Sequence, residues 1–187
     1  GLPEAQVALR PTAPGTEETL TAEVSTSDVD GDGVSVSYVW SVDGVEVSGE
    51  TDATLDGALY FDKDQTVQVT VTPNDGLDTG EVASSAVSVA NTPPYAPSVQ
   101  IAPDDPAAGS ENLVCEITEE SVDLDGDAVS YTASWTVDGD VWTGTTVTTS
   151  WTDDTVPGTE TVEDEVWECT MTPEDGDDDG DQGTDDV

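Results

Sequence analysis

Apolar and polar residues alternate in short runs along the whole chain, which is the pattern of strands that bury one face. In the run 20–24, the apolar positions are Leu20, Ala22 and Val24. Runs with the same period occupy 34–42, 67–71, 113–117, 129–137 and 167–171. No window holds a sustained helical period, and no apolar run approaches the roughly 18 residues of a membrane span. The pattern therefore predicts an all-β protein.

The same order of runs and motifs occurs twice. Residues 28–32 read DVDGD and residues 123–127 read DLDGD, and each motif precedes an alternating run that ends in W-x-V-D-G. Later, VQVTVTPNDG at 67–76 matches WECTMTPEDG at 167–176. Because one β-sandwich of the immunoglobulin type needs roughly 100 residues, the chain holds two copies. We expect domains at 1–92 and 93–187, joined by a short, stiff, proline-rich linker at 91–97.

The charge narrows the possible partners. There are 43 acidic residues against two basic residues, Arg10 and Lys63. Such a chain repels nucleic acid and anionic membrane surfaces and attracts cations. A solvated, salt-adapted surface would account for part of this charge. The absence of histidine removes the commonest general base and the commonest metal ligand.

Three residues of the second copy carry a family resemblance. Cys115, Trp135 and Cys169 resemble the Cys–Trp–Cys signature of immunoglobulin domains, on strands B, C and F. The whole chain resembles the Ig-like, PKD-like and cadherin-like tandem repeats of large bacterial surface proteins, which often carry D-x-D-G-D after one strand and T-P-x-D-G after another. The resemblance implies two tandem immunoglobulin-like Greek-key β-sandwiches. The first copy departs from it, with Ala22 and Val69 at the cysteine positions.

Cys115 and Cys169 occupy matched, inward-facing positions of the second copy. We expect a disulfide between the two sheets, with a pair of buried free thiols as the alternative. A disulfide closing a loop of about 55 residues would contribute about 4 kcal/mol in the chain-entropy model. It would also imply an oxidising compartment, and hence an extracellular or cell-surface location.

The D-x-D-G-D motifs predict metal sites. Asp28, Asp30 and Asp32 alternate across a loop that Gly31 allows to turn sharply, so their oxygens can converge on one hard cation. Two carboxylates about 4 Å apart repel by about 4 kcal/mol at an effective dielectric constant of about 20, so a cluster needs a counter-ion. An EF-hand is excluded, because the twelfth position of the motif is Val39 rather than Glu. We expect calcium rather than magnesium, since magnesium usually keeps several waters.

A second acidic turn is expected beside each motif, because strands B and F enter the same end of an immunoglobulin-like sandwich. The alternative is a pair of hydrophilic turns, in which Asp and Gly are common. The predicted calcium ligands are Asp28, Asp30, Asp32, Asn74, Asp75 and Asp78 in the first copy, Asp123, Asp125, Asp127, Glu174, Asp175 and Asp178 in the second, and Asn91 in the linker.

The end of the second copy predicts an incomplete sandwich. The two copies align with an offset of 100 residues, so Val187 matches Val87, inside the expected last strand of the first copy at 85–90. We therefore expect the second domain to lack its own last strand. Either the natural chain continues beyond Val187, or another chain supplies the strand, as in fibres built by strand addition.

These observations favour a structural protein rather than an enzyme. We expect a subunit or repeat segment of an extracellular filament or adhesin, stiffened by calcium at its domain junctions. Its partners would be copies of itself or neighbouring repeats, arranged head to tail. The alternative is a carbohydrate-binding accessory module of a secreted hydrolase, with a surface glycan stacked on Trp142 or Trp151. A catalytic carboxylate pair is also open, because acidic candidates occur throughout the chain.

Overall fold

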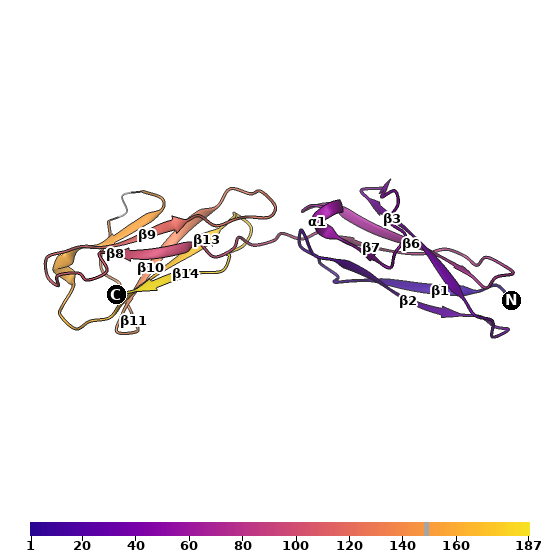
Figure 1. Ribbon diagram of the computed structural model, residues 1–187, viewed down its shortest axis with the longest axis horizontal. Helices are drawn as coiled ribbons and strands as arrows, with labels where there is room; N and C mark the ends of the chain where they lie inside the picture. Colours follow the sequence, from indigo (N-terminus) through magenta and orange to yellow (C-terminus); the bar gives the residue numbers. More distant parts are fainter. Residues whose placement is uncertain (148–149) are drawn as a thin grey trace. The chain divides into compact units, whose positions relative to one another are not determined.

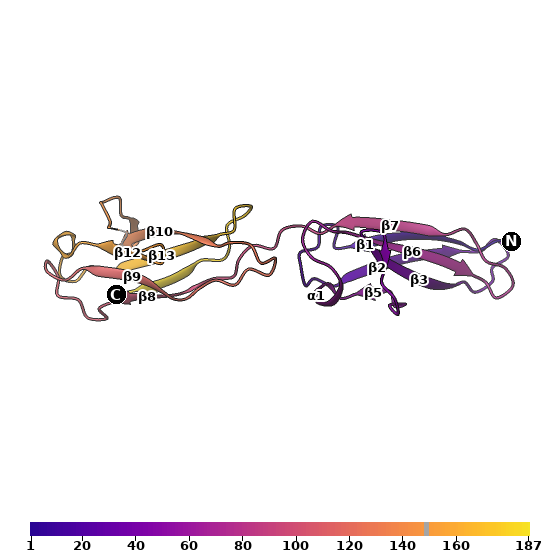
Figure 2. The same cartoon turned by 90° about the horizontal axis from the view of Figure 1, so that it is seen from above.

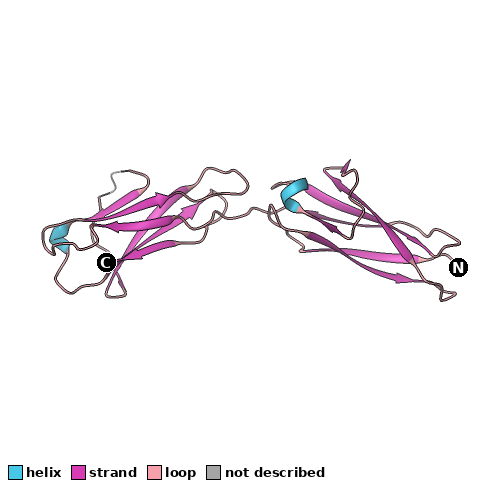
Figure 3. Ribbon diagram, in the orientation of Figure 1, coloured by secondary structure: helices cyan, strands magenta, loops and turns pink. Residues whose placement is uncertain are grey.

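The computed structural model describes residues 1–147 and 150–187, which divide into two compact units, Gly1–Thr92 and Pro93–Val187 (Figure 1). The regular structure of each unit is antiparallel strand, apart from a short helical turn (Figure 3). No helix among the described residues is long and apolar enough to cross a membrane. The predicted all-β tandem of sandwiches is therefore confirmed.

The first unit consists of two sheets with their apolar sides facing each other. One sheet has the order β1-β2-β5 and the other the order β4-β3-β6-β7. A single turn of helix, α1 (Gly57–Tyr60), follows β5. The strands are β1 (Glu4–Arg10), β2 (Leu20–Ser27), β3 (Ser35–Val42), β4 (Val45–Glu46), β5 (Thr54–Leu55), β6 (Thr66–Asn74) and β7 (Ala83–Ser88).

The second unit repeats this topology. Its sheets have the orders β12-β9-β8 and β11-β10-β13-β14, and a 3₁₀ turn at Gly158–Glu160 takes the place of α1. Figure 2 shows both units from a second direction. The strands are β8 (Ser98–Ala102), β9 (Leu113–Glu119), β10 (Ser130–Val137), β11 (Asp140–Val141), β12 (Asp153–Val156), β13 (Trp167–Glu174) and β14 (Gly183–Asp186).

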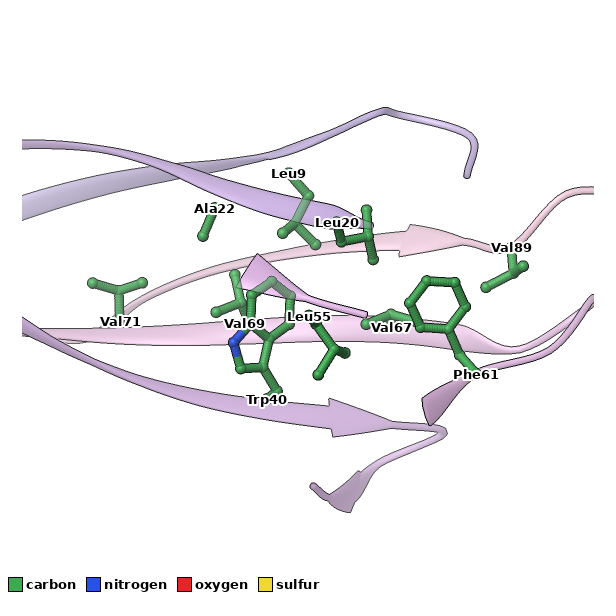
Figure 4. Packing of buried hydrophobic residues seen from close by; sticks show 10 residues of the cluster. All are labelled: Leu9, Leu20, Ala22, Trp40, Leu55, Phe61, Val67, Val69, Val71 and Val89. Carbon is green, nitrogen blue, oxygen red and sulfur yellow. The ribbon is translucent and has the colours of Figure 1, made fainter. Parts of the chain in front are cut away.

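The alternating residues of the sequence form the core of the first unit. Val67, Val69 and Val71 project from one face of β6 and are fully buried, while Leu20 and Ala22 of β2 face them from the other sheet (Figure 4). Trp40 lies between the sheets, and its indole N–H donates to the Asp52 carbonyl at 2.9 Å. The period of two thus places every second side chain in the core.

A disulfide joins the sheets of the second unit. Cys115 on β9 and Cys169 on β13 are bonded, with their Cα atoms 6.2 Å apart and both side chains fully buried. Trp135 packs in the same core. The predicted pairing is confirmed, and neither cysteine is free.

The expectation that the second unit lacks its last strand is wrong. Strand β14 pairs with β13 from Met171↔Gly183 to Glu168↔Asp186. Beyond it, Trp167 and Val187 exchange two backbone hydrogen bonds of 2.9 Å. The sequence does not predict this strand because its residues, GTDD, have no apolar alternation. The strand also begins at residue 183, two residues before the position expected from the first copy. Because the second unit forms this strand itself, the reason for expecting another chain to donate it no longer holds.

Candidate metal centre

Strand register brings the two predicted acidic loops of each unit together. In the first unit, Ser35, which follows the β2–β3 loop (28–34), pairs with Asn74, which precedes the β6–β7 loop (75–82). The Ser35 hydroxyl also donates to the Asn74 carbonyl at 2.9 Å. In the second unit, Ser130 and Glu174 make the matching pair between the β9–β10 loop (120–129) and the β13–β14 loop (175–182).

The β9–β10 loop of the second unit holds a cluster of three carboxylates. One oxygen from each of Asp123, Asp125 and Asp127 lies within 4.8 Å of the other two, and all three residues are half-buried. Ligand oxygens lie 2.3–2.6 Å from a calcium ion, so two of them on opposite sides of one ion are about 5 Å apart. The spacing of this cluster therefore fits a shared calcium ion.

One carboxylate organises this loop from within. Oδ1 of Asp123 accepts the backbone N–H groups of Asp125 at 2.9 Å and Asp127 at 3.0 Å. Oδ2 of Asp123 is enclosed by protein and has no hydrogen-bond partner among the described residues. A buried acceptor without a donor costs roughly 1–3 kcal/mol, and more when it is charged. A bound cation would remove that cost, so the donor set fits the metal that the motif predicts.

The β2–β3 loop of the first unit has the same internal bonding. Oδ1 of Asp28 accepts from the N–H groups of Asp30 at 2.8 Å and Asp32 at 3.3 Å. Oδ2 of Asp28 is again enclosed without a partner among the described residues. Asp30 differs from its counterpart because it forms an ion pair with the Gly1 amine. Asp30 and Asp32 are exposed, so this loop is more open than the one in the second unit.

The pKa of the Gly1 amine reflects the negative charge around it. Its pKa is raised, first by the hydrogen bond to Asp30 and then by the negative charges of Asp30, Asp28 and Asp75. One positive charge therefore interacts with carboxylates from both acidic loops of the first unit.

The β6–β7 and β13–β14 loops use several of their predicted ligands to close their own turns. Oδ1 of Asp75 accepts from the N–H groups of Leu77 at 2.8 Å and Asp78 at 2.6 Å, and these bonds lower its pKa. Asp175 accepts from Asp177 and Asp178, both at 2.8 Å.

Asn74 likewise bonds within its own loop, to Gly76 N–H at 2.8 Å and to the Thr79 hydroxyl at 2.9 Å. The three-carboxylate cluster does not include Glu174, Asp175 or Asp178. Asn91 belongs to the first unit, whereas the cluster belongs to the second. The metal roles of these residues stay predictions.

The two candidate sugar-stacking tryptophans have different surroundings. Trp142 is half-buried and packs edge-to-face on Trp167, with ring centroids 5.4 Å apart. Trp151 is 59% exposed and stacks on Tyr131. No pattern in the sequence singled out Asp154, which is buried and accepts the Trp135 indole N–H at 3.0 Å. In the first unit, the corresponding indole N–H of Trp40 donates to a backbone carbonyl, that of Asp52.

By fold and chemistry, the chain is a tandem of two immunoglobulin-like β-sandwiches with oxygen-rich acidic loops at one end of each. Its sequence matches no protein-family model and no curated protein. Among solved structures, a two-domain fibronectin type III segment of chicken tenascin aligns with 97% of this chain and 96% of its own length, at 11% identity and a TM-score of 0.45. The FN1–FN3 domains of chicken CNTN1 align over 100% of this chain and 67% of their own length, at 12% identity and a TM-score of 0.41.

Proposed function

We propose that this chain is a structural or adhesive module of an extracellular protein, in which calcium bound to the acidic loops stiffens a string of sandwiches. The proposal rests on one observation above all: carboxylate oxygens of Asp123, Asp125 and Asp127 lie within 4.8 Å of one another, and the enclosed Oδ2 of Asp123 has no hydrogen-bond partner in the part of the chain that the structure describes. The same loop chemistry recurs in the first unit. An acidic loop motif that recurs in tandem repeats favours a mechanical role.

The location of the site within the second unit supports stiffening. The Tyr95 N–H donates to the Val122 carbonyl at 3.0 Å, one residue before the cluster begins. The Pro94 carbonyl accepts from Asp181 N–H at 3.3 Å, on the neighbouring β13–β14 loop. The segment by which the chain enters this unit is thus bonded to both acidic loops. A cation that holds the β9–β10 loop in place would also hold the entry segment.

The disulfide supports an extracellular or cell-surface location, because such bonds persist in oxidising compartments. The partners in this proposal are neighbouring repeats or other copies of the chain, joined head to tail. The function requires no catalytic group. Calcium would neutralise carboxylates that repel one another and so convert a flexible string into a rod.

The calcium site is tested by substitution and titration. We expect calcium to raise the melting temperature of chelator-treated protein, and isothermal titration calorimetry to register binding. The double variant Asp123→Asn, Asp125→Asn should lose the binding in the second unit. Asp140→Asn removes one exposed acidic charge from β11 of the same unit and serves as the control. Unchanged binding in the double variant would show that the cluster is not the site.

Stiffening needs its own measurement, because a site can bind calcium without affecting the linker. Small-angle X-ray scattering of the two-unit chain should give a well-defined maximum dimension with calcium and a broader distance distribution after chelation. If calorimetry shows bound calcium while the distribution stays the same, calcium stabilises the loops alone and the rod model is rejected.

A further inference from the structure

A serine continues the spacing of the carboxylate cluster in the second unit. Ser121 stands two residues before Asp123, so oxygen-bearing side chains occur at 121, 123, 125 and 127. Ser121 lies outside the D-x-D-G-D motif, and every calcium ligand predicted from the sequence is a carboxylate or an amide rather than a hydroxyl. Its surroundings in the structure connect it with the cluster.

The Ser121 hydroxyl is enclosed by protein and has no hydrogen-bond partner among the described residues, as is also true of Oδ2 of Asp123. These two oxygens are therefore not hydrogen-bonded to each other, although a hydroxyl can donate to a carboxylate. Val122, which lies between the two residues, has a side chain that is 59% exposed. Since the middle residue faces solvent, the enclosed oxygens on either side of it lie toward the inside of the loop.

Two hydrogen bonds hold the backbone at this point. The Ser121 N–H donates to the Tyr131 hydroxyl at 2.6 Å, and the Val122 carbonyl accepts the Tyr95 N–H at 3.0 Å. Ser121 is thus held in place by the protein itself. A group that is already positioned needs less ordering when a ligand binds, which favours binding.

The first unit has no equivalent enclosed hydroxyl at this position. Aligning Asp28 with Asp123 places Thr26 opposite Ser121. Thr26 lies within β2, where it pairs with Ala5, and it is exposed. The β9–β10 loop therefore offers an enclosed neutral oxygen beside its carboxylates, whereas the β2–β3 loop does not offer one from this residue.

We propose that the Ser121 hydroxyl is a further ligand of the calcium ion in the second unit. This inference rests on the calcium binding proposed above and adds one residue to that site. Calcium takes about six to eight oxygen ligands, so three carboxylates leave room for a neutral oxygen. The hydroxyl binds through a lone pair and keeps its proton, and the enclosed Oδ2 of Asp123 binds the same ion.

A fourth protein oxygen also bears on the choice of metal. Magnesium requires nearly ideal octahedral geometry and gives up its waters reluctantly, whereas calcium accepts more ligands in a flexible arrangement. Each protein oxygen that replaces a water therefore favours calcium over magnesium. Ser121 contributes to this selectivity without adding to the negative charge of the loop.

The test uses terbium(III), a luminescent cation that prefers oxygen ligands as calcium does. The full chain carries Asp28→Asn and Asp30→Asn, which remove two carboxylates from the first unit and leave the loop of the second unit intact. Tyr131, whose hydroxyl is bonded to Ser121, should sensitise the emission of an ion bound there. Luminescence lifetimes in H₂O and D₂O then give the number of waters on the ion.

We expect Ser121→Ala in this background to raise the number of bound waters by about one, because a water takes the place of the hydroxyl. Calcium binding measured by calorimetry should weaken about three- to tenfold, since affinity follows the ligand set. Ser121→Thr keeps a hydroxyl and should keep the parent number of waters. Ser110→Ala makes the same substitution on an exposed residue at the other end of β9, and it should change neither quantity.

Two results would overturn the proposal, and they have different consequences. If folded Ser121→Ala holds the same number of waters as the parent, even with weaker affinity, the hydroxyl is not a ligand and the calcium site stands without it. If the background chain binds neither terbium nor calcium, this inference and the calcium site of the second unit are both rejected.

Discussion

At the scale of single residues, the aspartates of the acidic loops have identical side chains but different surroundings. Asp28 and Asp123 each use one oxygen to hold the loop backbone and leave the other enclosed within the loop. Asp75 uses one oxygen for two backbone N–H groups of its own turn. In all three residues one oxygen therefore holds two N–H groups, and the second oxygen of Asp28 and of Asp123 is enclosed by protein, where a bound cation would offset the cost of burying it.

Asp75 should therefore contribute to acid stability. The N–H groups of Asp78 and Leu77 hold its pKa below the ordinary value in the folded state. A lowered folded-state pKa gives stabilisation that is present above the unfolded-state pKa of about 4 and is lost as pH falls through the folded-state value. Asp75→Asn keeps an acceptor but does not titrate. Melting curves of parent and variant should differ at pH 6 and converge below pH 4; a constant difference across that range would contradict this account.

Some roles of single residues could be predicted from the sequence, and others could not. The motif D-x-D-G-D predicted that Asp123, Asp125 and Asp127 would lie together, because oxygens at every second position of a sharply turning loop can converge on one cation. Sequence did not distinguish a metal ligand from a turn-closing side chain at Asp75, because both roles select Asp in a Gly-rich turn. It also did not separate Trp142 from Trp151, since their surroundings come from distant strands.

At the scale of elements, the two units form the same pairs of sheets with different chemistry between them. The second unit has the Cys115–Cys169 disulfide, whereas the first has Ala22 and Val69 at the corresponding positions, both buried. The inward alternation that both units share was enough to predict the sandwich. The strand β14 was not predicted, because backbone pairing to β13 holds it and its sequence has no apolar alternation.

Replacing the disulfide with the residues of the first unit should leave a folded but less stable domain. The bond joins residues 54 apart in sequence, and its loss should lower the free energy of unfolding by about 2–4 kcal/mol. The variant is Cys115→Ala with Cys169→Val, compared with the parent by urea unfolding. The transition of the first unit acts as the internal control and should not move. Failure of the second unit to fold at all would mean that its core depends on the crosslink more than the repeat implies.

At the scale of the whole molecule, 43 acidic residues against two basic ones make self-repulsion a general term in stability. Salt should reduce it, because the screening length falls from about 10 Å at 0.1 M to about 3 Å at 1 M. We therefore expect the melting temperature of calcium-free protein to rise between 0.05 M and 1 M KCl.

Calcium added at 1 M KCl separates site binding from screening. Repulsion between distant surface charges is then already suppressed, while ligands that directly contact an ion still act at short range. We expect millimolar calcium to raise the melting temperature further in the parent but not in the double variant Asp123→Asn, Asp125→Asn. That result would show that calcium stabilises the protein through the carboxylate cluster of the second unit. If calcium had no effect beyond that of KCl, the acidic loops would be part of a generally solvated acidic surface. The proposal that bound calcium stiffens the chain would then be rejected.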